Sequence, residues 1–135
     1  MAIRKVLVVD DSDTDRKNLE QIVSGAGYSV ISARSGRDAV AMTKSEQPDA
    51  VLLDVIMPDM NGFQACRAIT NDAATKNIPV ILVSSKGEKT DKVWGQEQGA
   101  RGYVTKPFTP DQMARRIKIL LEPMRQQEPY KENSG

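Results

Sequence analysis

The sequence contains no histidine and a single cysteine in 135 residues. Without histidine, the chain cannot carry out Ser-His-Asp or Cys-His catalysis, cannot bind zinc through imidazole and cannot serve as a phosphohistidine carrier. Any phosphoryl chemistry must therefore take place on oxygen. Cys66 has no partner for an internal disulfide, and we expect it to be a small core residue.

The sequence also lacks a large net charge and a long apolar run. Its 19 Lys and Arg residues nearly balance its 18 Asp and Glu residues, for a net charge of +1, so there is no electrostatic case for a nucleic acid or membrane partner. No run approaches the ~18 apolar residues of a transmembrane helix, and the N-terminal residues lack the apolar stretch of a signal peptide. We expect a cytoplasmic protein whose partner is a protein or a small ion.

Apolar runs alternate with amphipathic segments along the chain. Periodicity and the Gly and Pro breaks predict strands at 6–9, 28–32, 50–54, 80–83 and 101–104, and helices at 13–26, 36–46, 62–72, 88–98 and 110–122. This alternation predicts an α/β fold with a doubly wound parallel sheet covered on both faces. Residues 1–122 would form one domain, and the polar, aperiodic residues 123–135 a disordered tail.

Side chains with useful chemistry stand where the predicted strands end. Asp10 and Asp11 follow the first strand, Asp54 ends the third, Ser84 follows the fourth and Lys106 the fifth. Ligands of such sheets bind at the carboxyl ends of the strands, so we expect these side chains to share one pocket. Three carboxylates in one pocket repel one another unless a pKa rises or a cation binds. A hard divalent cation with oxygen ligands, Mg²⁺ or Mn²⁺, fits this set.

Each of these side chains has a simpler explanation when it is taken alone. Asp10 and Asp11 could cap the following helix, and Asp54 could be a turn residue. Lys106 could be a solvated lysine, and Ser84 an ordinary hydroxyl at the end of a strand. Their coincidence at four strand ends favours a shared site over all of these explanations.

Taken together, four motifs resemble the CheY-type receiver domain of response regulators over residues 4–121. They are the pair Asp10-Asp11, the spacing Asp54-x-x-Met57-Pro58-x-x-x-Gly62, Ser84, and Tyr103-x-x-Lys106-Pro107. The resemblance implies a flavodoxin-like (βα)5 fold with a five-stranded sheet in the order 2-1-3-4-5. Within this family, residues 61–67, 90–95 and 98–100 are similar to the PilH-like single-domain regulators of type IV pilus twitching motility.

The resemblance implies a role for each residue of the expected site. Asp54 is the phosphoacceptor, and Lys106 and Ser84 contact the phosphoryl group, with Ser84 standing where many relatives carry threonine. The metal ligands implied are Asp10, Asp11, Asp54 and the backbone carbonyl of Ile56.

The resemblance also implies how the signal leaves the site. When Ser84 moves toward the phosphoryl group, Tyr103 fills the vacated space, although core packing is a competing explanation for this tyrosine. Pro107 is a candidate for a cis peptide bond. Val93 and Trp94 are implied at the output face, although Trp94 is equally well explained as a half-buried anchor.

The function implied is that of a single-domain regulator, because the chain ends after its last predicted helix. It would accept a phosphoryl group from a CheA-like or hybrid histidine kinase and signal, as a monomer, to a motility or pilus protein. It would be no enzyme beyond its own phosphorylation and dephosphorylation. Two alternatives stay open: a phosphate sink for a shared kinase, and a scaffold that works without phosphorylation.

Other classes of protein with a strand-end aspartate or a similar sheet fit less well. A phosphatase of the haloacid dehalogenase type needs a second aspartate two residues after the nucleophile, but position 56 is isoleucine. An FMN protein needs a phosphate loop after the first strand, where Asp10 and Asp11 would repel the phosphate. No GxxxxGK[ST] loop supports a nucleotide triphosphatase.

Overall fold

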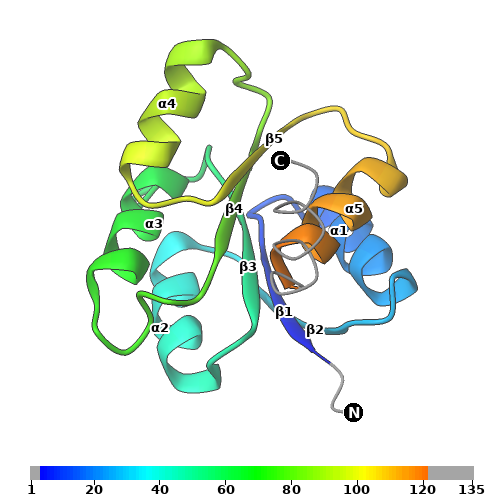
Figure 1. Ribbon diagram of the computed structural model, residues 1–135, viewed down its shortest axis with the longest axis horizontal. Helices are drawn as coiled ribbons and strands as arrows, with labels where there is room; N and C mark the ends of the chain where they lie inside the picture. The colour runs from blue at the N-terminus through cyan, green and yellow to red at the C-terminus, as the bar shows by residue number, and fades with distance from the viewer. Residues whose placement is uncertain (1–3, 122–135) are drawn as a thin grey trace, which may run out of the picture.

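Figure 1 shows a parallel sheet with helices on both of its faces. The computed structural model describes residues 4–121, in which five strands alternate with five helices. The strands are β1 (Lys5–Val9), β2 (Ser29–Ala33), β3 (Ala50–Asp54), β4 (Val80–Ser84) and β5 (Gly102–Thr105). The helices are α1 (Asp13–Gly25), α2 (Gly36–Glu46), α3 (Gly62–Asn71), α4 (Lys89–Glu97) and α5 (Pro110–Leu121). The predicted tail at 123–135, and residue 122 at the end of the predicted domain, lie outside the described residues.

The sheet has the order β2-β1-β3-β4-β5, and all four neighbouring pairs are parallel. The predicted fold class and strand order are therefore confirmed. Because β1 pairs with β2 on one side and with β3 on the other, the strand order reverses between β1 and β3. In open sheets of this kind the crevice at the carboxyl ends of such strands is the usual place for a ligand.

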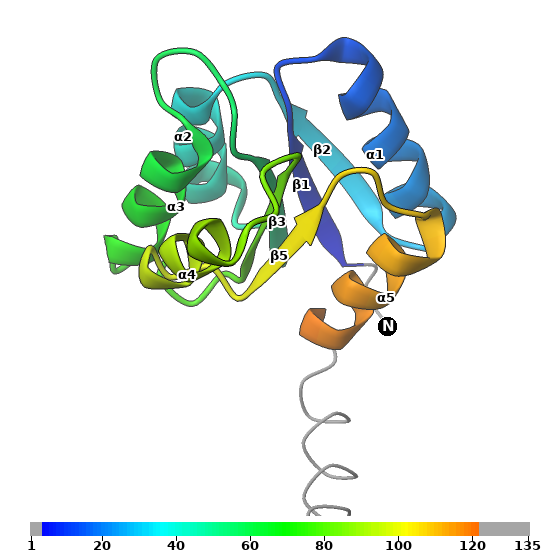
Figure 2. The same ribbon diagram turned by 90° about the horizontal axis from the view of Figure 1, so that it is seen from above.

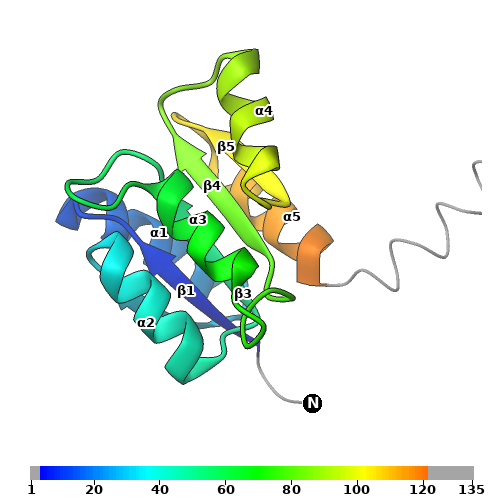
Figure 3. The ribbon, with the colours of Figure 1, turned by 90° about the vertical axis from the view of Figure 1, so that its left-hand side faces the viewer.

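Helices cover the sheet in two layers. Helices α1 and α5 lie on one face, and α2, α3 and α4 on the other (Figures 2 and 3). Alternate residues of β1 enter the two cores: Val6 and Val8 pack with α1 and α5, whereas Leu7 and Val9 pack with α2 and α3. Burial on both faces explains why β1, β3 and β4 are almost continuous apolar runs rather than alternating ones.

Side-chain caps mark the start of the first three helices. Ser12, Ser35 and Asn61 are the N-caps of α1, α2 and α3, and each accepts a hydrogen bond from a backbone N–H in the first turn. The predicted ends differ from the observed ones by a residue or two. The helix predicted at 13–26 ends at Gly25, and Ala26 lies in the exposed turn that follows. None of the described helices is long and apolar enough to cross a membrane.

Candidate functional site

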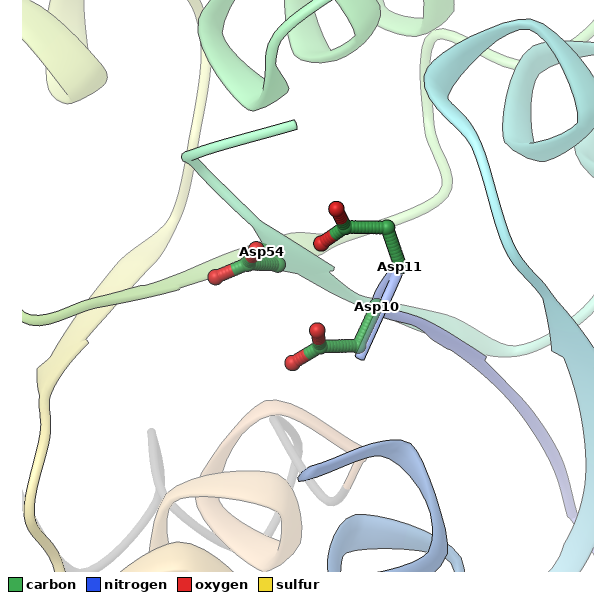
Figure 4. Close-up of side chains that lie close together, drawn as sticks. All are labelled: Asp10, Asp11 and Asp54. Carbon is green, nitrogen blue, oxygen red and sulfur yellow. The ribbon is translucent and has the colours of Figure 1, made fainter. Parts of the chain in front are cut away.

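Three carboxylates meet at the carboxyl ends of β1 and β3 (Figure 4). One oxygen each from Asp10, Asp11 and Asp54 lies within 4.8 Å of the others. The Asp10 and Asp54 residues are 1% and 5% exposed, whereas Asp11 is exposed to solvent. The three carboxylates that the sequence places at strand ends thus lie together, and their shared role stays a prediction.

The strand register brings the two buried carboxylates together. Val9 pairs with Leu53 in the ladder between β1 and β3, so the next residues, Asp10 and Asp54, leave the sheet side by side. Neither Asp10 nor Asp11 is the N-cap of α1, although Asp10 helps to fix the turn before this helix. Ser12 caps α1, while the Asp10 carboxylate accepts a hydrogen bond from the Ser12 N–H at 3.0 Å. One oxygen of Asp10 therefore fixes the loop, and the other accepts a hydrogen bond from the Lys106 ammonium.

Gly62 explains the spacing that follows Asp54. Its N–H donates to the Val55 carbonyl at 2.8 Å, which closes the loop between β3 and α3. A Cβ at this position would collide with the Asp54 carbonyl and the Val55 Cα, so only glycine fits without a shift of the backbone. The start of α3 can thus lie directly against the end of β3.

Burial and mutual repulsion perturb the protonation of the cluster. Burial, and then the charge of Asp10, raise the pKa of Asp54 to about 6, although Lys106 opposes the increase. Burial likewise raises the pKa of Asp10. Both shifts mean that the pocket holds negative charge at a cost, which a positive group in the pocket would relieve.

Lys106 supplies part of that positive charge from the loop after β5. Its Nζ lies 3.3 Å from the nearest Asp10 oxygen, 3.4 Å from that of Asp54 and 3.1 Å from that of Asp15. Burial of the lysine disfavours the charged form, but the carboxylates outweigh it and its pKa is raised. The Lys106–Pro107 peptide bond is cis, the isomer that the resemblance implied.

Ser84 and Tyr103 converge on the backbone of Lys86. Ser84 is fully buried at the end of β4, and its hydroxyl accepts a hydrogen bond from the Lys86 N–H at 3.0 Å. The Tyr103 hydroxyl donates to the Lys86 carbonyl from a partly buried position on β5. The backbone of Lys86 therefore connects the Ser84 hydroxyl at the end of β4 to Tyr103 on β5.

Two contributors to the site were not predicted from the sequence. Asp15, in the first turn of α1, pairs with Lys106, and nothing in its position distinguishes it from an ordinary acid near a helix N-terminus. Arg16 is buried, and its Nη1 donates to the Asp10 carbonyl at 3.0 Å. Arg16 shares the inner face of α1 with Leu19 and Val23. An arginine on the face of the helix that otherwise carries apolar residues was the sequence signal that could have indicated a buried polar contact.

The remaining predicted residues differ in how far they are exposed to solvent. Val93 and Trp94 on α4 are 46% and 50% exposed, and Trp94 makes an edge-to-face contact with Phe63 at 6.4 Å between ring centroids. A half-buried anchor and an output residue both fit this position. The Ile56 side chain is 52% exposed, and the role of its carbonyl as a metal ligand stays a prediction. Cys66 is buried as expected.

The donor set of the cluster fits a hard divalent cation. All three side chains offer carboxylate oxygens, two of them buried and carrying raised pKa values. Mg²⁺ is bound in proteins by one or two carboxylates together with waters and carbonyl oxygens. Asp10, Asp11 and Asp54 are therefore the residues that would hold it.

The family model for the response regulator receiver domain matches residues 6–118 of the chain. Among curated proteins, protein PilH of Pseudomonas aeruginosa is 46% identical over 117 residues, which are 87% of this chain and 97% of that protein. The chain spans about half the length of other curated relatives, the ycf27 regulators.

Solved structures with the same fold include chemotaxis proteins. The chain is similar to CheY4 of Vibrio cholerae, with a TM-score of 0.84 and 32% identity over 89% of this chain and 100% of that one. It is also similar to a chain of the CheX-CheY-BeF3-Mg²⁺ complex of Borrelia burgdorferi, with a TM-score of 0.80 and 32% identity, covering 84% of this chain and 86% of that one.

Proposed function

Because the chain belongs to the family of response regulator receiver domains, we propose that it accepts a phosphoryl group from a histidine kinase on Asp54 and passes the signal on through a change of conformation. The observation that carries this proposal is the cluster of Asp10, Asp11 and Asp54, whose oxygens lie within 4.8 Å of one another. Lys106 reaches the same cluster from the loop after β5. A carboxylate nucleophile, a cation site and an ammonium are the groups that phosphoryl transfer requires.

The transfer itself needs an ionised Asp54 in line with the donor. One Asp54 oxygen forms a bond to phosphorus as the bond between phosphorus and the donor imidazole breaks, and the imidazole leaves with the electron pair of that bond. Mg²⁺ held by Asp10, Asp11 and Asp54 would neutralise negative charge on the carboxylates and on the phosphoryl group. Lys106 then pairs with a phosphoryl oxygen, and the Ser84 hydroxyl donates to another.

The signal would leave the site through Lys86. If the Ser84 hydroxyl turns toward the phosphoryl group, it no longer accepts from the Lys86 N–H, with which it forms a 3.0 Å hydrogen bond in this structure. In this structure the Lys86 carbonyl accepts a hydrogen bond from the Tyr103 hydroxyl. When the backbone of Lys86 moves after the loss of the Ser84 contact, this bond breaks and Tyr103 can take a new position. Phosphorylation needs to change the free-energy difference between two pre-existing states by only a few kcal/mol to switch the protein, because about 1.4 kcal/mol corresponds to a tenfold change in their population ratio.

The similarity to PilH supports a place in type IV pilus or twitching control. We propose a cytoplasmic monomer that receives its phosphoryl group from a CheA-like or hybrid kinase and acts on a motility or pilus protein through α4 and its neighbours. Its only catalysis would be its own phosphorylation and dephosphorylation.

A phosphotransfer assay with the histidine kinases of the source organism tests this proposal. The expected result is Mg²⁺-dependent transfer to the wild type and none to Asp54→Asn, with a protein partner captured only by the beryllofluoride-treated form. Transfer to Asp54→Asn at the same site would contradict the proposal. Transfer without any state-dependent partner would favour a phosphate sink, and capture that is indifferent to Asp54 would favour a scaffold.

A further inference from the structure

Lys106 makes its shortest ionic contact with Asp15, a residue outside the acidic cluster. The distance from Nζ to the Asp15 oxygen is 3.1 Å, against 3.3 Å to Asp10 and 3.4 Å to Asp54. An ammonium has three N–H donors, so three carboxylates can occupy all of them. A phosphoryl oxygen that enters the site must therefore take the place of one carboxylate.

Asp15 is the carboxylate that can give way at the lowest cost. Asp10 is buried and anchored by the Ser12 N–H, and Asp54 carries the incoming group. The Asp15 side chain is 51% exposed. It lines, together with Lys106 and Pro107, a groove of about 410 Å³ between α1 and the loop after β5. Water can therefore solvate the Asp15 carboxylate as soon as the lysine turns away from it.

We propose that Asp15 competes with the phosphoryl group for Lys106 and so weakens the binding of phosphoryl groups at the acidic site. This proposal rests on the function proposed above for Asp54 and Lys106. Asp15 is a positioning residue, because it touches the lysine and not the reacting atoms. An ion pair with one half-exposed partner changes an equilibrium by about two- to fivefold.

The chain offers a closely matched control at Asp38. Asp15 and Asp38 each stand three residues after a capping serine, and their N–H groups donate to the Ser12 and Ser35 hydroxyls at 3.3 and 3.1 Å. Among the described residues, however, the Asp38 carboxylate has no ion pair. Asp13 is the second control, because it lies in the same turn as Asp15 and pairs with Arg16 rather than with Lys106.

The test is a calorimetric titration of the full chain with beryllofluoride, a phosphoryl analogue, at saturating Mg²⁺. Asp15→Asn should bind it about two- to fivefold more tightly than the wild type, because the competing charge is gone. Asp15→Glu should stay within about twofold of the wild type, since a longer carboxylate still reaches the lysine. Asp38→Asn and Asp13→Asn should match the wild type.

Three results would overturn the proposal. Asp15→Asn that binds as Asp38→Asn does would show that the ion pair has no influence, and weaker binding would show that Asp15 helps to orient the lysine. An equal gain in Asp13→Asn would show that any charge in this turn has the same effect. If the wild type itself fails to bind beryllofluoride, it is the proposed function that fails.

Discussion

Replacing Asp54 with asparagine should make the metal-free protein more stable near neutral pH. Burial, and then the charge of Asp10, raise the Asp54 pKa from 3.8 to about 6. The ionised carboxylate therefore destabilises the folded state relative to the unfolded chain. The difference between these pKa values corresponds to about 3 kcal/mol, at about 1.4 kcal/mol per pH unit. The asparagine amide must still be desolvated, so we expect the free energy of unfolding to rise by only about 1–2 kcal/mol.

The sign of this effect fixes its pH dependence. A carboxyl group whose pKa is higher in the folded state favours folding below the pKa of the unfolded chain, and this contribution is lost as the pH rises through the folded pKa. Wild type and Asp54→Asn should therefore have similar stabilities below about pH 4. They should separate as the pH rises from 3.8 to about 6, where the folded Asp54 loses its proton.

Urea denaturation in the presence of a chelator measures this difference directly. Asp38→Asn, which removes an exposed charge, is the control and should leave the midpoint nearly unchanged at every pH. Excess Mg²⁺ should raise the wild-type midpoint, because a ligand that binds only the folded state stabilises it, and should raise that of Asp54→Asn much less. A variant no more stable than the wild type at pH 7.5, or a gap that widens as the pH falls, would refute the reasoning.

Mg²⁺ should bind more tightly as the pH rises from about 5 to about 7, because the cation displaces the proton of Asp54, whose pKa is about 6; calorimetric affinities that stay flat would contradict this. Gly62→Ala should cost roughly 2 kcal/mol or more, since its Cβ meets the Asp54 carbonyl. At Gly25 a Cβ would meet no other atom, so Gly25→Ala should instead raise the free energy of unfolding by about 0.5–1 kcal/mol. Equal urea midpoints for the two variants would show that the collision at Gly62 has no effect on stability. Cys66 should resist thiol reagents at pH 8, because burial raises its pKa to about 12. Rapid labelling of this thiol in the native protein would contradict the prediction.

The strand ends were the most predictable part of the site. Asp10, Asp54, Ser84 and Lys106 each end or follow a strand that a short apolar run reveals, and parallel pairing brings all these ends to one edge. The sequence therefore predicts both the sheet and the meeting of these side chains. Local patterns were enough to place the strands and helices along the chain, whereas the strand order 2-1-3-4-5 was implied by the family resemblance.

The contacts between Asp15 and Lys106 and between Arg16 and the Asp10 carbonyl could not be predicted in the same way. They depend on how α1 is rotated about its axis and on the path of the loop after β5, and neither leaves a periodic pattern in the sequence. The link from Ser84 to Tyr103 through Lys86 has the same origin, since it runs through backbone atoms that every residue carries.

Mapping the site of modification shows whether Asp54 is a metal-assisted phosphoacceptor. The protein is incubated with phosphoramidate and Mg²⁺, and the modified residue is located by mass spectrometry of the peptides. We expect one phosphoryl group, on Asp54, that disappears when Mg²⁺ is chelated or when Asp54 is replaced by asparagine. A phosphoryl group on another residue of the wild type, or undiminished modification after either change, would contradict it.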